Sequence, residues 1–243
     1  MTDVTVRSLE TYLREARRIR RELAGDGVST PVWLRGHRIS SWSLSPTLYR
    51  GNVERHWERE LVRDFKLRSG VLLKNSPSNY LEWLYVMRDY GVPTRILDWS
   101  ESPLVALFFA LCEVRKMESA CVWVLRPWSL NWLSLRWESV PTTDLKDLER
   151  YALPEETGKV VRTVEANLPV AVRPRYAIHR AVGQSGMFTV HGTSTDPIET
   201  VCSDKHGNWL RKVKIAPKSC ESMFKELYES GLRPRQYFPI LAD

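Results

Sequence analysis

The sequence has 243 residues and lacks any long apolar run. A helix needs roughly 18 or more consecutive apolar residues to cross a bilayer, and the longest uninterrupted apolar stretch covers only residues 103–112. The N-terminal residues also contain no apolar signal region of the kind that directs secretion. We therefore expect a cytoplasmic protein that does not contact a membrane.

Cysteine and histidine are sparse, with four and five residues respectively. No two cysteines have the Cys-x-x-Cys spacing of zinc or redox sites, and the histidines show no metal-ligand spacing. We expect reduced, structural cysteines and no metal site. The sequence also lacks Gly-x-Gly-x-x-Gly, a Walker loop, His-Glu-x-x-His and Gly-x-Ser-x-Gly. Because these motifs are absent, the sequence gives little support to metal catalysis or to classical serine hydrolysis.

Positive charge is in moderate excess, with 36 Lys and Arg against 29 Asp and Glu, which gives a net charge of +7. Such an excess permits contact with nucleic acid or another polyanion but does not require it. Many arginines fall within residues 14–21, on one predicted helix, where a solvated helix face is the simplest interpretation.

Hydrophobic periodicity and turn residues predict the secondary structure. We expect helices over 8–24, 54–73, 79–89, 103–117 and 220–230. We expect strands over 31–34, 94–98, 120–125, 175–181, 186–191 and 210–215. Because helices come first and strands come late, the fold class is α+β: N-terminal helices followed by a mixed, mainly antiparallel sheet. The expected domains are an N-terminal helix (1–29) and one main domain (30–243) with a less regular insertion around 126–170.

The first of these strands leads into Arg35 and Gly36. Arginine binds phosphate or carboxylate through a bidentate fork, and glycine lets a ligand approach the backbone closely. A structural arginine paired with a carboxylate is an equally good reading of the same residues.

A second group of polar residues follows the turn at Tyr90. Arg95 and Asp98 lie three residues apart in a predicted strand, and buried charges of this kind need partners. Ser102 can cap the next helix, whose amide groups favour an anion. An Arg95–Asp98 structural pair with a serine cap is the alternative.

Two further segments stand out. Gln184 precedes the strand 186–191, where its amide could hold a ribose hydroxyl or simply complete a turn. Residues 231–239 place two arginines near an aromatic ring, which suits either a phosphate contact or a surface turn.

These segments, taken in order, resemble the FRG domain family, named after its Phe-Arg-Gly motif. Residues 34–36 (Leu-Arg-Gly) and 42–48 (Trp-Ser-Leu-Ser-Pro-Thr-Leu) are similar to its first motif. Residues 90–100 (Tyr-Gly-Val-Pro-Thr-Arg-Ile-Leu-Asp-Trp-Ser), followed by 102–110, resemble its central motif. Residues 180–189 and the pair at 238–239 resemble its last two. Two departures are visible: Leu34 replaces Phe, and Arg88-Asp89 replaces the family's Gln-His.

The layout of these motifs is similar to that of ADP-ribosyltransferases, and this resemblance implies an NAD-consuming enzyme. It implies the following catalytic residues: Arg35, Asp98, Glu101 and Gln184. It implies the following residues for binding NAD: Arg35, Gly36, Tyr49, Tyr90, Thr94, Arg95 and Ser102. The implied setting is a bacterial toxin or phage-defence effector that modifies nucleic acid, RNA rather than DNA, or protein, with a cognate antitoxin as a further partner.

Two other functions remain open at this point. A non-catalytic module that binds nucleic acid or a nucleotide would explain the basic charge, and its affinity would fall steeply with salt. A hydrolase acting on a phosphate ester or nucleic acid would need a metal or a base that the sequence does not reveal.

Overall fold

The computed structural model describes residues 4–24, 30–50, 56–69, 73, 76–112, 118–151, 168–174, 186–203 and 209–233. Seven strands form one sheet in the order β1-β7-β4-β2-β3-β6-β5. The strands are β1 (Val4–Val6), β2 (Trp33–His37), β3 (Ile96–Ser100), β4 (Cys121–Leu125), β5 (Val170–Val172), β6 (Gly186–Val190) and β7 (Leu210–Ile215). Among these seven described strands, β1 and β7 pair in parallel and every other pair is antiparallel. The mainly antiparallel sheet is therefore confirmed, in a mixed α/β fold.

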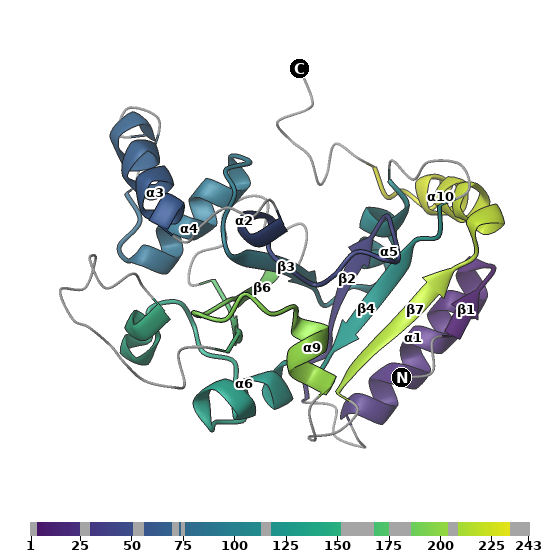
Figure 1. The fold of residues 1–243 in the computed structure, drawn as a ribbon. Helices are drawn as coiled ribbons and strands as arrows, with labels where there is room; N and C mark the ends of the chain where they lie inside the picture. The colour runs from purple at the N-terminus through teal and green to yellow at the C-terminus, as the bar shows by residue number, and fades with distance from the viewer. Residues whose placement is uncertain are drawn as a thin grey trace.

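The helices are interspersed among the strands and do not precede them (Figure 1). They are α1 (Leu9–Ala24), α2 (Thr47–Arg50), α3 (His56–Ser69), α4 (Tyr80–Asp89), α5 (Pro103–Leu111), α6 (Pro127–Leu135), α9 (Ile198–Ser203) and α10 (Cys220–Glu229), with 3-10 turns η1 (Lys146–Tyr151) and η3 (Pro217–Ser219). No helix in these described ranges has both the length and the apolar character that crossing a bilayer requires.

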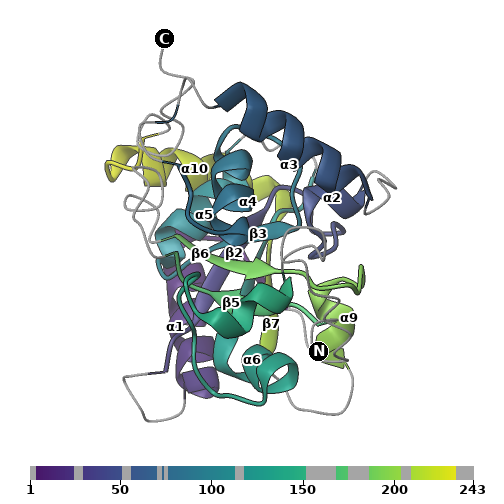
Figure 2. The same ribbon diagram turned by 90° about the vertical axis from the view of Figure 1, so that its left-hand side faces the viewer.

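Side chains alternate along each strand, so the residues on the two faces of the sheet belong to different apolar clusters. In β4, Val122 and Val124 join α1, α5 and α10 on one face. Cys121, Trp123 and Leu125 join α6 and α9 on the other. A third apolar cluster packs α3, α4 and η1 against β3, β5 and β6, and Figure 2 shows α3 and α4 together at that end of the molecule.

Several predicted boundaries differ from the observed ones. Residues 126–170 are not wholly irregular, because 127–135 form α6 with Pro127 in its first turn. The helix expected over 103–117 ends at Leu111, since Cys112 has an extended backbone. The strand expected over 94–98 is shifted to Ile96–Ser100. The strand expected over 175–181 lies outside the described residues. The division after residue 29 stays a prediction, and α1 packs into the same core as β4 and β7.

Gly36 sets the distance between β2 and α5. A Cβ atom at this position would lie 2.1 Å from the Ala106 carbonyl oxygen and 2.4 Å from the Ala110 nitrogen. Both are backbone atoms of a helix, so neither can move without moving α5. Gly36 therefore brings a strand and a helix into backbone contact.

We expect Gly36→Ala to lower the free energy of unfolding by about 3 kcal/mol or more, because overpacking against backbone cannot relax. Urea denaturation of the purified variant measures this. Gly91→Ala is the matched control: Gly91 has a φ of 79° and no atom within 4 Å of an added Cβ, so it should lose only about 1–2 kcal/mol from the left-handed backbone. Equal losses in the two variants would contradict the steric explanation.

Candidate functional site

The sheet is split between β2 and β3. These neighbouring strands share a single paired position, Leu34 opposite Ser100, whereas β2 and β4 pair along five positions. Past this pair, towards Arg35 in β2 and Trp99 in β3, the strands diverge, and a cavity of about 250 Å³ opens between them. It is lined by α5 residues such as Phe109 from one face and by Trp99, which belongs to the core of the other face.

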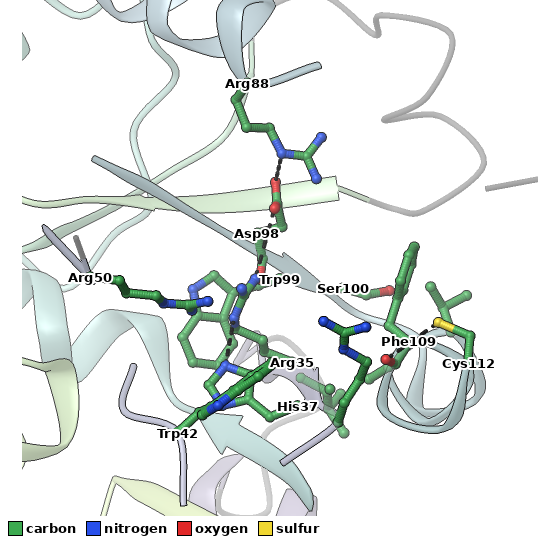
Figure 3. A pocket seen from close by; sticks show the side chains of 15 residues that line it. Arg35, His37, Trp42, Arg50, Arg88, Asp98, Trp99, Ser100, Phe109 and Cys112 are labelled. Carbon is green, nitrogen blue, oxygen red and sulfur yellow. Dashed lines mark hydrogen bonds and ion pairs between the residues drawn. The ribbon is translucent and has the colours of Figure 1, made fainter. Parts of the chain in front are cut away.

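Arg35 bridges the split (Figure 3). Its Nη1 donates to the carbonyl oxygen of Asp98 at 2.7 Å and lies 3.8 Å from the Asp98 carboxylate. Its Nε donates to Nε2 of His37 at 3.1 Å. The Arg35 side chain thus donates to a backbone carbonyl of β3 at a position where β2 and β3 no longer pair. The sequence interpretation that Arg35 pairs with a carboxylate and the one that it faces a ligand site both agree with this position.

Positive charge dominates the cavity. Four arginines line it, namely Arg35, Arg38, Arg50 and Arg88, against one carboxylate, Asp98. Burial lowers the pKa of Arg35 to about 10, and the nearby charges of Arg50 and Arg88 act in the same direction. Arg35 still holds its charge near neutral pH, and an anion in the cavity would relieve the repulsion among these groups.

The carboxylate of Asp98 is held by two arginines, Arg35 and Arg88. Arg88 Nε lies 2.6 Å from Asp98 Oδ1, and Arg88 Nη1 donates to Asp89 at 2.6 Å. Burial acts to lower the pKa of Arg88, but the carboxylates of Asp98 and Asp89 outweigh it and raise that pKa. The side chain of Asp98 remains 31% exposed. Because Arg88 comes from α4, the end of this helix is fastened to β3 at the site.

An aromatic ring stands at the rim between two cations. The guanidinium groups of Arg38 and Arg50 lie 5.3 Å and 5.8 Å from the centre of the Trp42 ring, and the His37 ring meets Trp42 edge-on. Arg50 also donates to the Ser45 carbonyl at 2.8 Å, which fixes its direction. The sequence interpretation missed these residues. The two-residue spacing of Arg35 and His37 on a strand, which puts them on one face, was the available signal.

Arg95 has a different role from the one expected. Its side chain is completely buried, and its Nε lies 3.1 Å from Glu58, which is also completely buried. It donates to the carbonyl oxygens of Tyr151 and His191 and does not line the cavity. The expected Arg95–Asp98 pair is therefore wrong, and a phosphate contact by Arg95 is contradicted by its burial. It is a structural cation.

Four other residues expected to bind NAD lie at different places relative to the cavity. Gly36 lines the cavity described above. Tyr90 and Thr94 line a second cavity beside it. Ser102 caps α5 by accepting from the Val105 amide at 3.3 Å, as expected for a helix cap.

Arg95 and Ser102 line neither of the two cavities, and Glu101 and Tyr49 also lie outside them. Glu101 lies 3.5 Å from Arg173 and lines neither of the two. Tyr49 also lines neither, and its hydroxyl donates to the Gly192 carbonyl at 3.4 Å. Gln184 lies outside the described residues. Among the described ranges, no group of three or more His, Cys, Asp or Glu side chains is placed to hold a metal ion.

The geometry defines a mixed α/β protein with an arginine-rich cavity in a split sheet. Residues 30–119 match the sequence model of the FRG domain, in agreement with the resemblance that the motifs indicate. Every residue that lines the cavity falls within that match. No curated protein and no solved structure gives a significant match to the chain.

We expect the buried pair of Arg95 and Glu58 to be needed for folding. Glu58→Gln leaves a buried cation without its counter-charge, and such a loss lowers the free energy of unfolding by about 3–5 kcal/mol. Urea denaturation measures the loss. The double variant Glu58→Gln/Arg95→Met removes both charges and should recover part of it. A single variant as stable as the wild type would contradict the buried pairing.

We also expect acid to destabilise the protein through its buried histidines. Burial lowers the pKa of His37 to about 2 and that of His191 to about 3. Both stay neutral in the folded state but bind a proton in the unfolded state below about pH 6.5. Stability is therefore complete above that pH and is lost as the pH falls, by about 2 kcal/mol per histidine between about pH 7 and pH 5.

The measurement is urea denaturation of the wild type and His37→Gln at both pH values. Glutamine can still accept from Arg35 but does not titrate, so the variant should lose less stability on acidification than the wild type. An identical pH dependence would show that His37 is not buried in its neutral form.

Proposed function

We propose that the protein is an NAD-dependent ADP-ribosyltransferase whose reaction takes place in the split between β2 and β3. The observation that carries the proposal is the composition of this cavity: four guanidinium groups, aromatic rings and one carboxylate face the same space. NAD presents the complementary groups, namely two charged phosphates, two rings and a ribose at which positive charge develops.

The arginines suit the pyrophosphate of NAD. Guanidinium groups bind phosphate oxygens in pairs through parallel hydrogen bonds, and mutual repulsion of Arg35, Arg50 and Arg88 favours a bound anion. Arg35 is already oriented by His37 and by the Asp98 carbonyl. A donor held in place in advance loses little freedom when the ligand binds.

Aromatic surface for the rings of NAD is present in the same cavity. Trp42, Trp99 and Phe109 line it, and stacking on such rings stabilises planar heterocycles. Stacking by Tyr49 or Tyr90, which the resemblance implies, finds less support, since neither residue lines this cavity. Trp42 is therefore the preferred stacking residue in the proposal.

Asp98 is the residue that would stabilise the transition state. The bond between ribose C1′ and the nicotinamide nitrogen breaks, and its electron pair leaves with neutral nicotinamide. Positive charge then develops on the ribose, and a fixed carboxylate nearby lowers its energy. The acceptor forms the new bond to C1′ and loses its proton to solvent. The acceptor is nucleic acid or protein, in keeping with a toxin or phage-defence effector that a cognate antitoxin restrains.

A non-catalytic nucleotide-binding module is the alternative function. It is favoured by the two contacts that Arg88 and Arg35 make with the Asp98 carboxylate, which neutralise much of its charge. Such a module would bind NAD or another nucleotide through the same arginines without releasing nicotinamide.

Nicotinamide release from NAD by the purified protein tests the proposal, with total RNA, denatured DNA or cell lysate added in turn. Asp98→Asn should lower the rate by about 10²–10³-fold, because one electrostatic stabiliser is lost. Glu101→Gln is the matched control and should keep the wild-type rate, since Glu101 lines neither cavity. Arg35→Ala should abolish release through loss of binding. Tight NAD binding without release under every addition would establish the alternative.

A further inference from the structure

A second cavity of about 420 Å³ adjoins the first. It lies between the end of α4 and β3, and the two cavities have three lining residues in common: Arg35, Arg88 and Asp98. The Asp98 carboxylate and its arginine partners thus form the wall between two spaces. A transferase needs such an arrangement, because donor and acceptor must approach the reacting carbon from different sides.

The charges of the second cavity are balanced. Arg35 and Arg88 are offset by Asp89 and Asp98, and the remaining lining residues are uncharged. A lysine or arginine side chain of a protein acceptor would meet carboxylates that are already paired with arginines. A neutral polar group, such as a nucleobase or a ribose hydroxyl, is better matched to this lining.

An aromatic run leads away from the mouth of this cavity. Tyr90 at the rim is 51% exposed, and its ring centre lies 5.6 Å from that of Phe65. Phe65 in turn meets Trp83 edge-on at 6.4 Å, and the Lys66 ammonium lies 5.5 Å from the Trp83 ring. One side of Tyr90 is thus supported by packing, while half of the residue is open to solvent.

Basic side chains accompany the aromatic run on α3. Lys66 and Arg68 follow Phe65 in sequence, and Arg63 and Arg59 lie about one and two turns before Lys66. Glu60 and Asp64 offset part of this charge through ion pairs with Arg59 and Arg63. Glu58 does not contribute at the surface, because it is buried with Arg95. Stacking rings beside a basic track are the features by which proteins bind single-stranded nucleic acid.

We propose that single-stranded RNA binds along α3 and the Tyr90 turn and delivers one nucleotide into the second cavity, next to Asp98. The role of this RNA as the acceptor rests on the proposed function, whereas its binding does not. Stacking would accept either RNA or DNA, but the exposed Thr47 in the cavity lining offers a hydroxyl oxygen that can accept a hydrogen bond from a 2′-hydroxyl group. This group is what distinguishes RNA from DNA at a protein site.

Fluorescence anisotropy with a labelled, unstructured RNA of about ten nucleotides tests binding in the absence of NAD. Tyr90→Ala should weaken the affinity by about tenfold, since one stacked base is lost. Tyr90→Phe keeps the ring and should restore it. The matched control is Tyr228→Ala on α10, where a tyrosine that is 45% exposed has the Arg233 guanidinium 3.9 Å from its ring centre.

A second pair of variants tests the charge. Arg68→Glu on α3 should weaken binding and reduce the slope of log Kd against the logarithm of salt concentration by about one. Arg20→Glu, at another exposed helix position on α1, should do neither. Circular dichroism and thermal melting establish that each variant is folded.

The outcomes separate this proposal from the proposed function. Equal losses in Tyr90→Ala and Tyr228→Ala, or no loss in either, would overturn the RNA surface even if nicotinamide is released. DNA of the same sequence binding as tightly as RNA would overturn the assignment to RNA. Tyr90-dependent RNA binding by a protein that never cleaves NAD would support the surface and refute the transferase.

Discussion

One buried charge organises the half of the molecule that contains the candidate site. A guanidinium group cannot stay ionised in an apolar interior without partners, and Arg95 recruits its partners from separate segments. Glu58 comes from α3, the Tyr151 carbonyl from η1 and the His191 carbonyl from the end of β6. The Tyr80 ring of α4 lies 5.7 Å from the guanidinium. Because α4 is held in this way, Arg88 at its end reaches Asp98.

The site therefore depends on two arginines that sequence reasoning treated alike. Both Arg35 and Arg95 sit in segments with a strand pattern and both were expected to bind phosphate. Sequence alone does not show which one has its counter-charge elsewhere, because Glu58 lies 37 positions before Arg95, in the separate helix predicted over 54–73. Burial and pairing, which only the folded chain shows, separate the ligand-facing cation from the structural one.

Local sequence patterns predicted most of the elements that line the cavity. The features that they did not predict arise from how distant segments pair in the folded chain. The helix ending at Asp89 and the cap at Ser102 follow from nearest-neighbour chemistry, so they were predictable. The split between β2 and β3 was not, because it arises from the failure of two strands to continue pairing after one position. The aromatic and cationic cluster at Trp42 was missed for the same reason: its members converge only when the chain has folded.

Gly36 has a consequence for any compound directed at this cavity. Part of the cavity wall is main chain, where β2 meets α5 at Ala106, and both residues line the space. Resistance to an inhibitor usually arises when a side chain in the binding site is exchanged for another. Here a larger residue at position 36 would collide with a helix backbone, so an inhibitor resting on this wall would contact a surface that the protein can alter only at a large loss of stability.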